Sequence, residues 1–259
     1  MGRGVCEGWF KMSDLWGIYA LWYREAKVFL REKSRLVSST VNPLIWLVAF
    51  GGGLGASISI GGAGYQAFIF PGVLMLVVLF TTIFFGLYVV WDKKIDFFKE
   101  VLVSPLKRTS IFVGKMLGGC TDGLIQSGII ILFGPLFGIN YTAYSLGLVI
   151  LFVLLLAMGT TSLGLAIGSQ MTSFEGFGLV QSFVILPLFF LSGALYPIDN
   201  LPAWLSWITY ANPLTYIVDG MRGALLGESS FPIVLDLGVA AAYVAVLVAI
   251  GTFAFKKMT

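Results

Sequence analysis

The sequence predicts an all-α integral membrane protein, and three observations support this fold class. Of the 259 residues, 58% are hydrophobic and 11% are charged, whereas a soluble domain carries about 25% charged residues. The mean hydropathy is +0.93. The apolar residues also form continuous runs that suit helical spans of about 20 residues, rather than alternating strands of about ten. The whole chain, residues 1–259, is therefore expected to form one transmembrane domain.

Six apolar runs are long enough to be membrane-spanning helices, and they cover residues 36–56, 67–91, 109–138, 144–168, 177–196 and 233–255. Of the 16 Lys and Arg residues, seven lie in residues 1–35, six in 92–115 and two at Lys256 and Lys257. With six spans these three regions share one side, which the positive-inside rule makes cytoplasmic. Both termini are therefore expected in the cytoplasm of a protein of the inner cell membrane. The net charge of +3 then reflects topology and indicates no nucleic-acid partner.

Residues 13–35 are predicted to form an amphipathic helix on the membrane surface. Apolar and aromatic residues such as Leu15, Trp22 and Phe29 share one helical face. The opposite face carries the basic residues Arg24, Lys27, Arg31 and Arg35. This pattern is typical of a helix lying along an anionic inner leaflet. Residues 1–12 lack the compact apolar core of a cleavable signal peptide. The alternative is a solvated helix packed on a cytoplasmic partner.

The stretch "DKKIDFFKEVLVSPLKR", residues 92–108, places many charges between two apolar runs. It predicts a short helix over 92–105, in which Asp92, Asp96 and Glu100 recur every four residues beside an apolar stripe. A proline ends this helix. Apolar side chains surrounded by both charge signs fit a groove on another protein, and the alternative is a solvated loop. The residues expected to dock are Ile95, Asp96, Phe98, Lys99, Glu100, Leu102, Ser104 and Pro105.

Residues 197–228, between the last two spans, are too long for a simple turn and are broken by prolines. Trp204 and Trp207 suit a membrane interface, and Asn212-Pro213 is expected to divide the segment into two short helices. Asp219 and Arg222 are three residues apart and are expected to pair on one helical face. The alternative is a plain extracellular loop.

The composition disfavours several kinds of site. The chain has no histidine and two cysteines, Cys6 and Cys120, which are not expected to pair, so no zinc, haem or other metal site is predicted. The glycine-rich residues 51–64 lack the strand and GK[ST] context of a nucleotide site. Asp122 is expected to form structural hydrogen bonds within its span, with catalysis or proton relay as the alternative.

Three glycine pairs have GxxxG spacing, which permits close helix contact and offers weak evidence for a seam between two copies. They are Gly51/Gly55, Gly134/Gly138 and Gly164/Gly168.

The chain resembles the permease subunits of type-2 ABC exporters, the group that includes daunorubicin-resistance and polysaccharide-export permeases. One signature is Glu100, Leu102 and Ser104-Pro105 followed by Gly114-Lys115. The other is "PLFFLSGALYPIDNLPAWLSWITYANPLTYIVDGMRG", which includes Pro187 and Asn212-Pro213. The family often has Arg-Glu-Gly before the first signature, where this chain reads "DKKIDFF".

The resemblance implies a half-transporter that moves an amphipathic, drug-like, lipid-like or glycolipid and polysaccharide cargo outward. It implies as partners a second copy of the chain, with the first and fifth spans as candidate dimer faces, and two copies of a separate ATPase subunit. ATP and Mg would bind that subunit, so this chain is expected to hold no cofactor. In this reading residues 92–105 are the coupling helix, and residues 197–228 form outer re-entrant helices that act as a gate.

The candidate pathway residues are apolar or aromatic: Phe84, Tyr88, Phe183 and Pro187. The alternatives from other classes are a membrane-embedded lipid-modifying enzyme and a secondary transporter. The first would need clustered catalytic side chains near one membrane face, and the second would need internally repeated halves.

Overall fold

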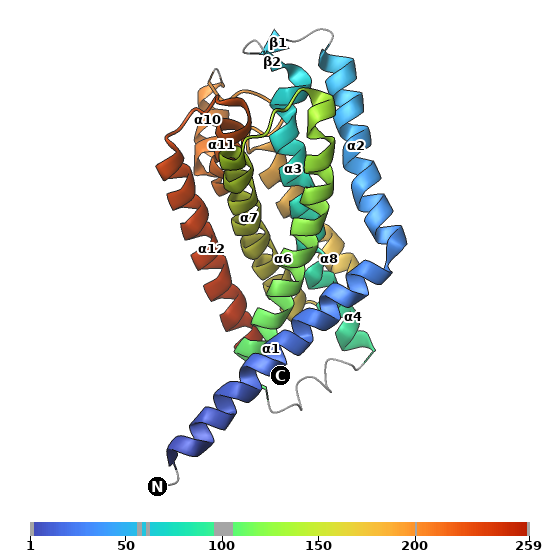
Figure 1. Cartoon of the computed structure of the whole chain (residues 1–259), viewed down its shortest axis with the longest axis vertical. Coiled ribbons are helices and arrows are strands. Elements are labelled where there is room, and N and C mark those ends of the chain that lie inside the picture. The colour runs from blue at the N-terminus through green and yellow to red at the C-terminus, as the bar shows by residue number, and fades with distance from the viewer. Residues whose placement is uncertain (1–2, 56–58, 61–62, 96–105, 200, 258–259) are drawn as a thin grey trace.

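The computed structural model describes residues 3–55, 59–60, 63–95, 106–199 and 201–257. Within these ranges the chain is a bundle of helices, which confirms the predicted all-α class (Figure 1). A small antiparallel hairpin, β1 (Ser59–Ile60) with β2 (Ala63–Gly64), lies at one end of the bundle. Both chain termini lie at the other end, where α1 crosses the bundle obliquely.

The helices are named by their labels in Figure 1. The first group is α1 (Arg3–Arg31), α2 (Lys33–Gly55), α3 (Tyr65–Ile83), α4 (Phe85–Lys94) and α6 (Arg108–Phe133), followed by the 3₁₀ turn η1 (Gly134–Phe137). The second group is α7 (Ala143–Gln170), α8 (Phe174–Val180), the π-helical turn η2 (Gln181–Ile185), α9 (Leu186–Phe190), α10 (Ala203–Ala211), α11 (Pro213–Leu226) and α12 (Ile233–Lys256).

Four helical segments of the described residues are long and apolar enough to cross a membrane: Tyr65–Lys94, Arg108–Phe137, Ala143–Gln170 and Ile233–Lys256. They correspond to four of the six predicted spans. The other two predicted spans contain shorter apolar helices, Pro43–Gly53 and Phe174–Phe190. A helix therefore lies in each of the six predicted ranges, while the count of six spans stays a prediction.

The centre of the bundle is formed by α3, which packs against α2, α6, α7 and α11. The most apolar part of Tyr65–Lys94, the segment that comprises α3 and α4, is 72% buried, against 22% for the corresponding part of α12. Buried hydroxyls join the helices across this core. Thr82 of α3 hydrogen-bonds Thr160 of α7, and Thr81 donates to Gln126 of α6. Such polar contacts between apolar helices stabilise packing where burial from water contributes little.

Glycines let α7 approach the junction of α3 and α4 closely. A Cβ added at Gly168 would lie 2.1 Å from the carbonyl oxygen of Gly86, and one added at Gly86 would lie 2.0 Å from that of Gly164. Only residues without a side chain permit this distance. Gly51 and Gly134 also face side chains of their own chain. These GxxxG glycines therefore serve contacts within the chain, and their spacing does not by itself indicate a second copy.

The fifth predicted span, 177–196, is not one continuous α-helix. Pro187 has no N–H and cannot continue the regular ladder, and just before it Leu186 donates its N–H to the carbonyl of Gln181, five residues back. This spacing makes η2 a π-helical turn. The helix then ends at Phe190, and the turn that follows contains Gly193 with φ of +72°.

Candidate functional site

Four charged residues from three helices meet at the end of the bundle that holds α1, and we call them the charge cluster: Arg24, Glu25, Asp92 and Lys115. The Nζ of Lys115 lies 2.7 Å from Oδ2 of Asp92 and 3.1 Å from Oε1 of Glu25. Arg24 adds contacts of 2.9 Å to Glu25 and 3.9 Å to Asp92. Only 1% of Lys115 is exposed. The cluster joins α1, α4 and α6.

The sequence of α6 explains why α1 lies close enough for these contacts. Gly114 and Gly118 lie one turn apart beneath α1. A Cβ added at Gly114 would lie 2.8 Å from Cβ of Leu21, and one added at Gly118 would lie 2.7 Å from Cβ of Glu25. Trp22 fixes the same contact through a 2.8 Å hydrogen bond to Thr121. Two glycines thus form the groove that brings Glu25 to Lys115.

The charges of the cluster balance, with two carboxylates against one ammonium and one guanidinium group. Removing charges from water is expensive, and mutual attraction offsets this only when each charge keeps its partners. Loss of one partner would leave Lys115 with an incompletely paired buried charge. Ionisable groups within apolar helices are also candidates for functional sites. The cluster is therefore both a structural junction and the leading functional candidate.

Lys93 holds a second side of the last turn of α4. Its Nζ donates to the carbonyl oxygens of Gly168, Ser169 and Met171 at 3.1, 2.5 and 3.3 Å. These carbonyls belong to the end of α7, where the backbone lacks partners within the helix. The end of α4 is therefore fixed by Asp92 on one side and by Lys93 on the other.

The placement of Asp92 corrects one expectation from the sequence. Asp92 was expected to begin the helix over 92–105 and to share a face with Asp96 and Glu100. It instead belongs to α4, is 5% exposed and contacts Lys115. Its partner is 23 residues away, so local periodicity does not reveal it.

Most of the predicted docking helix lies outside the described residues, and its role stays a prediction. Ile95 follows α4 directly and is 56% exposed. The remaining docking residues, which fall in 96–105, are Asp96, Phe98, Lys99, Glu100, Leu102, Ser104 and Pro105.

The predicted surface helix corresponds to α1, which begins earlier than expected and ends at Arg31. Lys27 and Arg31 are exposed, as the prediction requires. Arg24 contacts Glu25 and Asp92 of the charge cluster, although its side chain is also 38% exposed. Arg35 lies in α2, and its side chain is outside the described residues.

The apolar face of α1 is divided between two surroundings. Phe29 is 1% exposed and packs inside the protein, and Trp22 bonds to α6. Leu15, Tyr19 and Leu30 are exposed, which suits contact with lipid.

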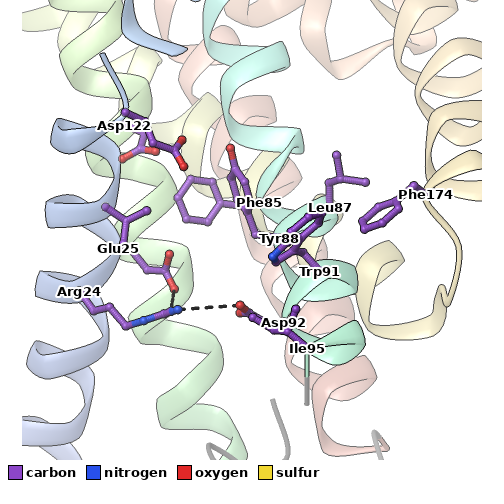
Figure 2. A pocket seen from close by; sticks show the side chains of 12 residues that line it. Arg24, Glu25, Phe85, Leu87, Tyr88, Trp91, Asp92, Ile95, Asp122 and Phe174 are labelled. Atoms are coloured by element: carbon purple, nitrogen blue, oxygen red, sulfur yellow. Dashed lines mark hydrogen bonds and ion pairs between the residues drawn. The ribbon is translucent and has the colours of Figure 1, made fainter. Parts of the chain in front are cut away.

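A cavity of about 560 Å³ lies beside the charge cluster. Its walls come from α1, α4, α6 and α8, and Figure 2 shows Tyr88, Asp122 and Phe174 around it. Of the predicted pathway residues, only Tyr88 lines this cavity.

The other pathway candidates lie elsewhere. Phe84 is the junction between α3 and α4, whereas Phe183 and Pro187 are exposed on η2 and α9. The structure therefore does not bring the four predicted pathway residues together in one place.

At the far end of the bundle, the predicted division at Asn212-Pro213 is present. α10 ends at Ala211 and α11 begins at Pro213. The Asn212 side chain accepts a 3.0 Å hydrogen bond from the N–H of Leu214, which caps α11, and donates one of 2.6 Å to the carbonyl of Leu188. The predicted interface residues Trp204 and Trp207 are exposed on α10.

Asp219 and Arg222 attract each other at longer range, but they do not form the direct ion pair that their spacing suggests. The Asp219 carboxylate accepts hydrogen bonds from the backbone N–H groups of Ser230 and Phe231, at 2.9–3.1 Å. Spacing along α11 places the two residues near each other, but their partners come from other segments.

Arg222 has its own partners. It donates to the carbonyl of Gly193 at 3.0 Å, and its guanidinium carbon lies 4.0 Å from the ring centre of Phe68. Asp219 therefore ties α11 to the residues just before α12, while Arg222 ties α11 to α3 and to the turn after α9.

Two features were missed by sequence reasoning. The first is the ion pair of Glu25 with Lys115. The available signal was Lys115 itself, because a lysine inside an apolar run is unusual. Asp236 was also missed. It is fully buried in α12, and within the described part of the chain neither of its carboxylate oxygens has a hydrogen-bond partner. The sequence did offer a signal for Asp236, since it is an acidic residue near the start of the apolar run 233–255.

Comparisons with known proteins identify the family of the chain. The family model of the ABC-2 type transporter matches residues 17–226. The inner membrane transport permease YadH of Escherichia coli K12 is 29% identical over 87% of this chain and 89% of its own length. The ycf38 transport permease of Cyanophora paradoxa is 30% identical over 82% and 76%. Nodulation protein J of Rhizobium leguminosarum bv. viciae is 26% identical over 92% and 93%.

These matches confirm the predicted resemblance and favour a transport component over a lipid-modifying enzyme. With its long apolar helices, the chain is a multi-pass membrane protein. The chain belongs to the ABC-2 type transporter family, as a permease.

Proposed function

We propose that this permease is the membrane half of an ATP-driven exporter of amphipathic cargo, paired with a second copy of itself and with two copies of a separate ATPase subunit. The observation that carries the proposal is the fixation of the last turn of α4. Asp92 and Lys93 hold this turn from two sides, and the chain continues from it into the predicted coupling helix.

The last turn of α4 can transmit movement of the ATPase subunit to the helix bundle. Asp92 is only a few residues before the predicted coupling helix, so a movement of residues 96–105 by the ATPase subunit would also move Asp92. Because Asp92 binds Lys115, and Lys115 binds Glu25, the movement acts on α6 and α1 together. Rigid elements with discrete packings transmit motion in this way.

The proposed orientation places the charge cluster at the cytoplasmic end of the helix bundle. Both termini lie at the same end of the bundle as α1 (Figure 1), and the basic residues of the sequence concentrate in the segments at that end. The positive-inside rule then assigns this end to the cytoplasm. The helices α10 and α11 face outward in this orientation and act as the outer gate, held closed by the contacts of Asp219 and Arg222.

Purification of the affinity-tagged chain from its own cells tests the proposal. A separate ATPase subunit should co-purify, and the complex should hydrolyse ATP. The double variant Phe98→Ala/Leu102→Ala should weaken this association about a hundredfold or more, because each buried side chain of this size contributes roughly 1.5–3 kcal/mol.

The matched control is Leu132→Ala/Leu136→Ala, which shortens two exposed leucines at the other end of the bundle. It should leave the association unchanged. The proposal fails if no ATPase accompanies the wild-type chain, or if the Phe98/Leu102 variant retains it at wild-type affinity.

A further inference from the structure

The helix α7 contacts both the last turn of α4 and the helix α11 of the proposed outer gate, which lies at the far end of the bundle (Figure 1). It is one α-helix of 28 residues without a proline, whereas the fifth predicted span is interrupted before Pro187. Sharp kinks in helices occur at prolines and π-helical turns, so α7 is expected to move as one rigid element. Its residues Phe152 and Gly168 are about 24 Å apart at the helical rise of about 1.5 Å per residue.

The cytoplasmic end of α7 is bound to α4 through Lys93. The Nζ of Lys93 donates to the carbonyl oxygens of Gly168, Ser169 and Met171. Carbonyl groups at the end of a helix lack partners within it and carry a partial negative charge, so they attract an ammonium group. The backbone of α4 also touches α7 at Gly86, where a Cβ has no room. A movement of the last turn of α4 therefore acts directly on the end of α7.

The other end of α7 supports α11 through Phe152. This side chain is 0% exposed, and a Cβ added at Gly220 of α11 would lie 2.2 Å from its Cζ atom. Gly220 follows Asp219 directly and precedes Arg222 by two residues, and these are the two residues whose contacts hold α11 in place. A movement of α7 therefore reaches α11 at the point where its contacts to neighbouring segments are concentrated.

We propose that α7 transmits the movement of the last turn of α4 to α11, with Lys93 and Phe152 as the positioning residues at its two ends. The inference rests on the proposed function and extends it. Asp92 passes the movement to α6 and α1, whereas the adjacent Lys93 passes it to α7 and so to the outer gate. Closely packed helices shift between discrete arrangements, so a movement at one end of α7 is carried to the other end.

The reporter for the outer gate is Leu214→Cys, because Leu214 lies in the first turn of α11 and is 1% exposed. The parent chain combines it with Cys6→Ala/Cys120→Ala, so that the reporter is the single thiol of the permease. The complex with its ATPase subunit is placed in lipid nanodiscs, and the rate of labelling by a maleimide is measured with and without ATP and vanadate. Trapping of the ATPase should raise the labelling rate at least about fivefold, the lower end of typical coupling between two sites.

Lys93→Met and Phe152→Leu should each reduce this rise to below about twofold, with ATP hydrolysis retained and the rate without ATP unchanged. Lys93→Arg keeps a cationic donor and should restore the rise. The matched controls are the neighbouring residues: Lys94→Met, an exposed lysine whose Nζ lies 4.0 Å from the ring centre of Phe174, and Leu151→Ala, a 39% exposed residue of α7. Both controls should resemble the parent chain.

The ratio of the two labelling rates separates transmission from a structural role, because a variant that only loosens the fold raises the rate without ATP as well. Phe152→Leu keeps an apolar side chain, so it decides the test if Lys93→Met does not assemble. A parental rise in Phe152→Leu, or no rise in the parent chain, would overturn the inference. If that happens while the ATPase subunit still co-purifies, the proposed function stands, whereas absence of the ATPase would overturn both.

Discussion

Lys115 of α6 and Asp92 of α4 form a buried ion pair, with 2.7 Å between Nζ and Oδ2. The pair lies at the point where the second predicted span leads into the predicted docking helix. Glu25 of α1 contacts the same ammonium group. The contact therefore connects three segments that the proposed mechanism requires to move together, and it leads to predictions about stability and about transport.

Asp92→Asn should lower the free energy of unfolding by about 3 kcal/mol, near the lower end of the range for breaking a buried ion pair. The lower end applies because Glu25 still contacts Lys115. Asp14 offers a matched control, since it also joins α1 to a lysine, Lys107, at 2.7 Å, but that lysine side chain is 58% exposed. Asp14→Asn should lower it much less, because an ion pair with an exposed lysine is screened by water and contributes little. Denaturant unfolding of the purified variants measures both losses of stability, and equal losses would contradict the assignment of Asp92 to a buried ion pair.

Asp219 and Arg222 should contribute to stability mainly through different partners. Asp219→Ala removes hydrogen bonds to a charged group, each worth about 1.5–3 kcal/mol, and Arg222→Ala removes the contacts to Gly193 and Phe68. The Asp219 carboxylate also attracts the buried guanidinium group without a direct bond, so the double variant should show a coupling energy of about 0.5–1 kcal/mol, at the low end of the range for interacting residues. A double-mutant cycle on unfolding free energies measures this. A coupling above about 2 kcal/mol would restore the direct pair that the spacing suggested.

Gly86→Ala should disrupt the contact between α4 and α7, since the added Cβ would overlap the carbonyl oxygen of Gly164. Reduced yield of folded protein and a lower unfolding midpoint are expected in detergent. Gly128 is the matched control: it lies within α6, and no atom lies within 4 Å of its added Cβ. Gly128→Ala should be neutral or stabilising by about 0.5–1 kcal/mol. The close helix approach would be contradicted if Gly86→Ala were as stable as Gly128→Ala.

Asp236→Asn should leave the unfolding midpoint unchanged or raise it, although the residue is fully buried. A buried carboxylate without a partner opposes folding, and the amide carries no charge to desolvate. The comparison is Asp219→Asn, which should lower the midpoint because that carboxylate holds the backbone of Ser230 and Phe231. Thermal unfolding followed by circular dichroism distinguishes the two. A large loss in Asp236→Asn would show that its carboxylate has a partner in the membrane.

The sequence predicted those parts of the fold that depend on local pattern. Apolar runs located a helix in each of the six ranges, and Asn212-Pro213 located the boundary between α10 and α11, because a cap and a proline act within one turn. Local pattern also predicted the exposed tryptophans of α10.

The contacts between distant segments were beyond such reasoning. Glu25 and Lys115 are 90 residues apart, and only the packing of α1 on Gly114 and Gly118 brings them together. Asp219 and Arg222 were paired by their spacing, whereas the fold offers Asp219 two backbone N–H groups and offers Arg222 an aromatic face. Asp92 was assigned to the wrong helix for the same reason, since its periodicity matched Asp96 and Glu100 while its partner lay on α6.

The most direct test of the account measures coupling in Lys115→Met, with Lys107→Met as control. Both variants remove an ammonium group that contacts α1, but only Lys115 also contacts α4. The complexes are reconstituted with the co-purifying ATPase in liposomes, and export of an amphipathic test compound, tetraphenylphosphonium, is measured against ATP hydrolysed. The account predicts that Lys115→Met retains its ATPase subunit but exports at least about tenfold less cargo per ATP, while Lys107→Met resembles the wild type. Wild-type export per ATP by an assembled Lys115→Met complex would contradict the account.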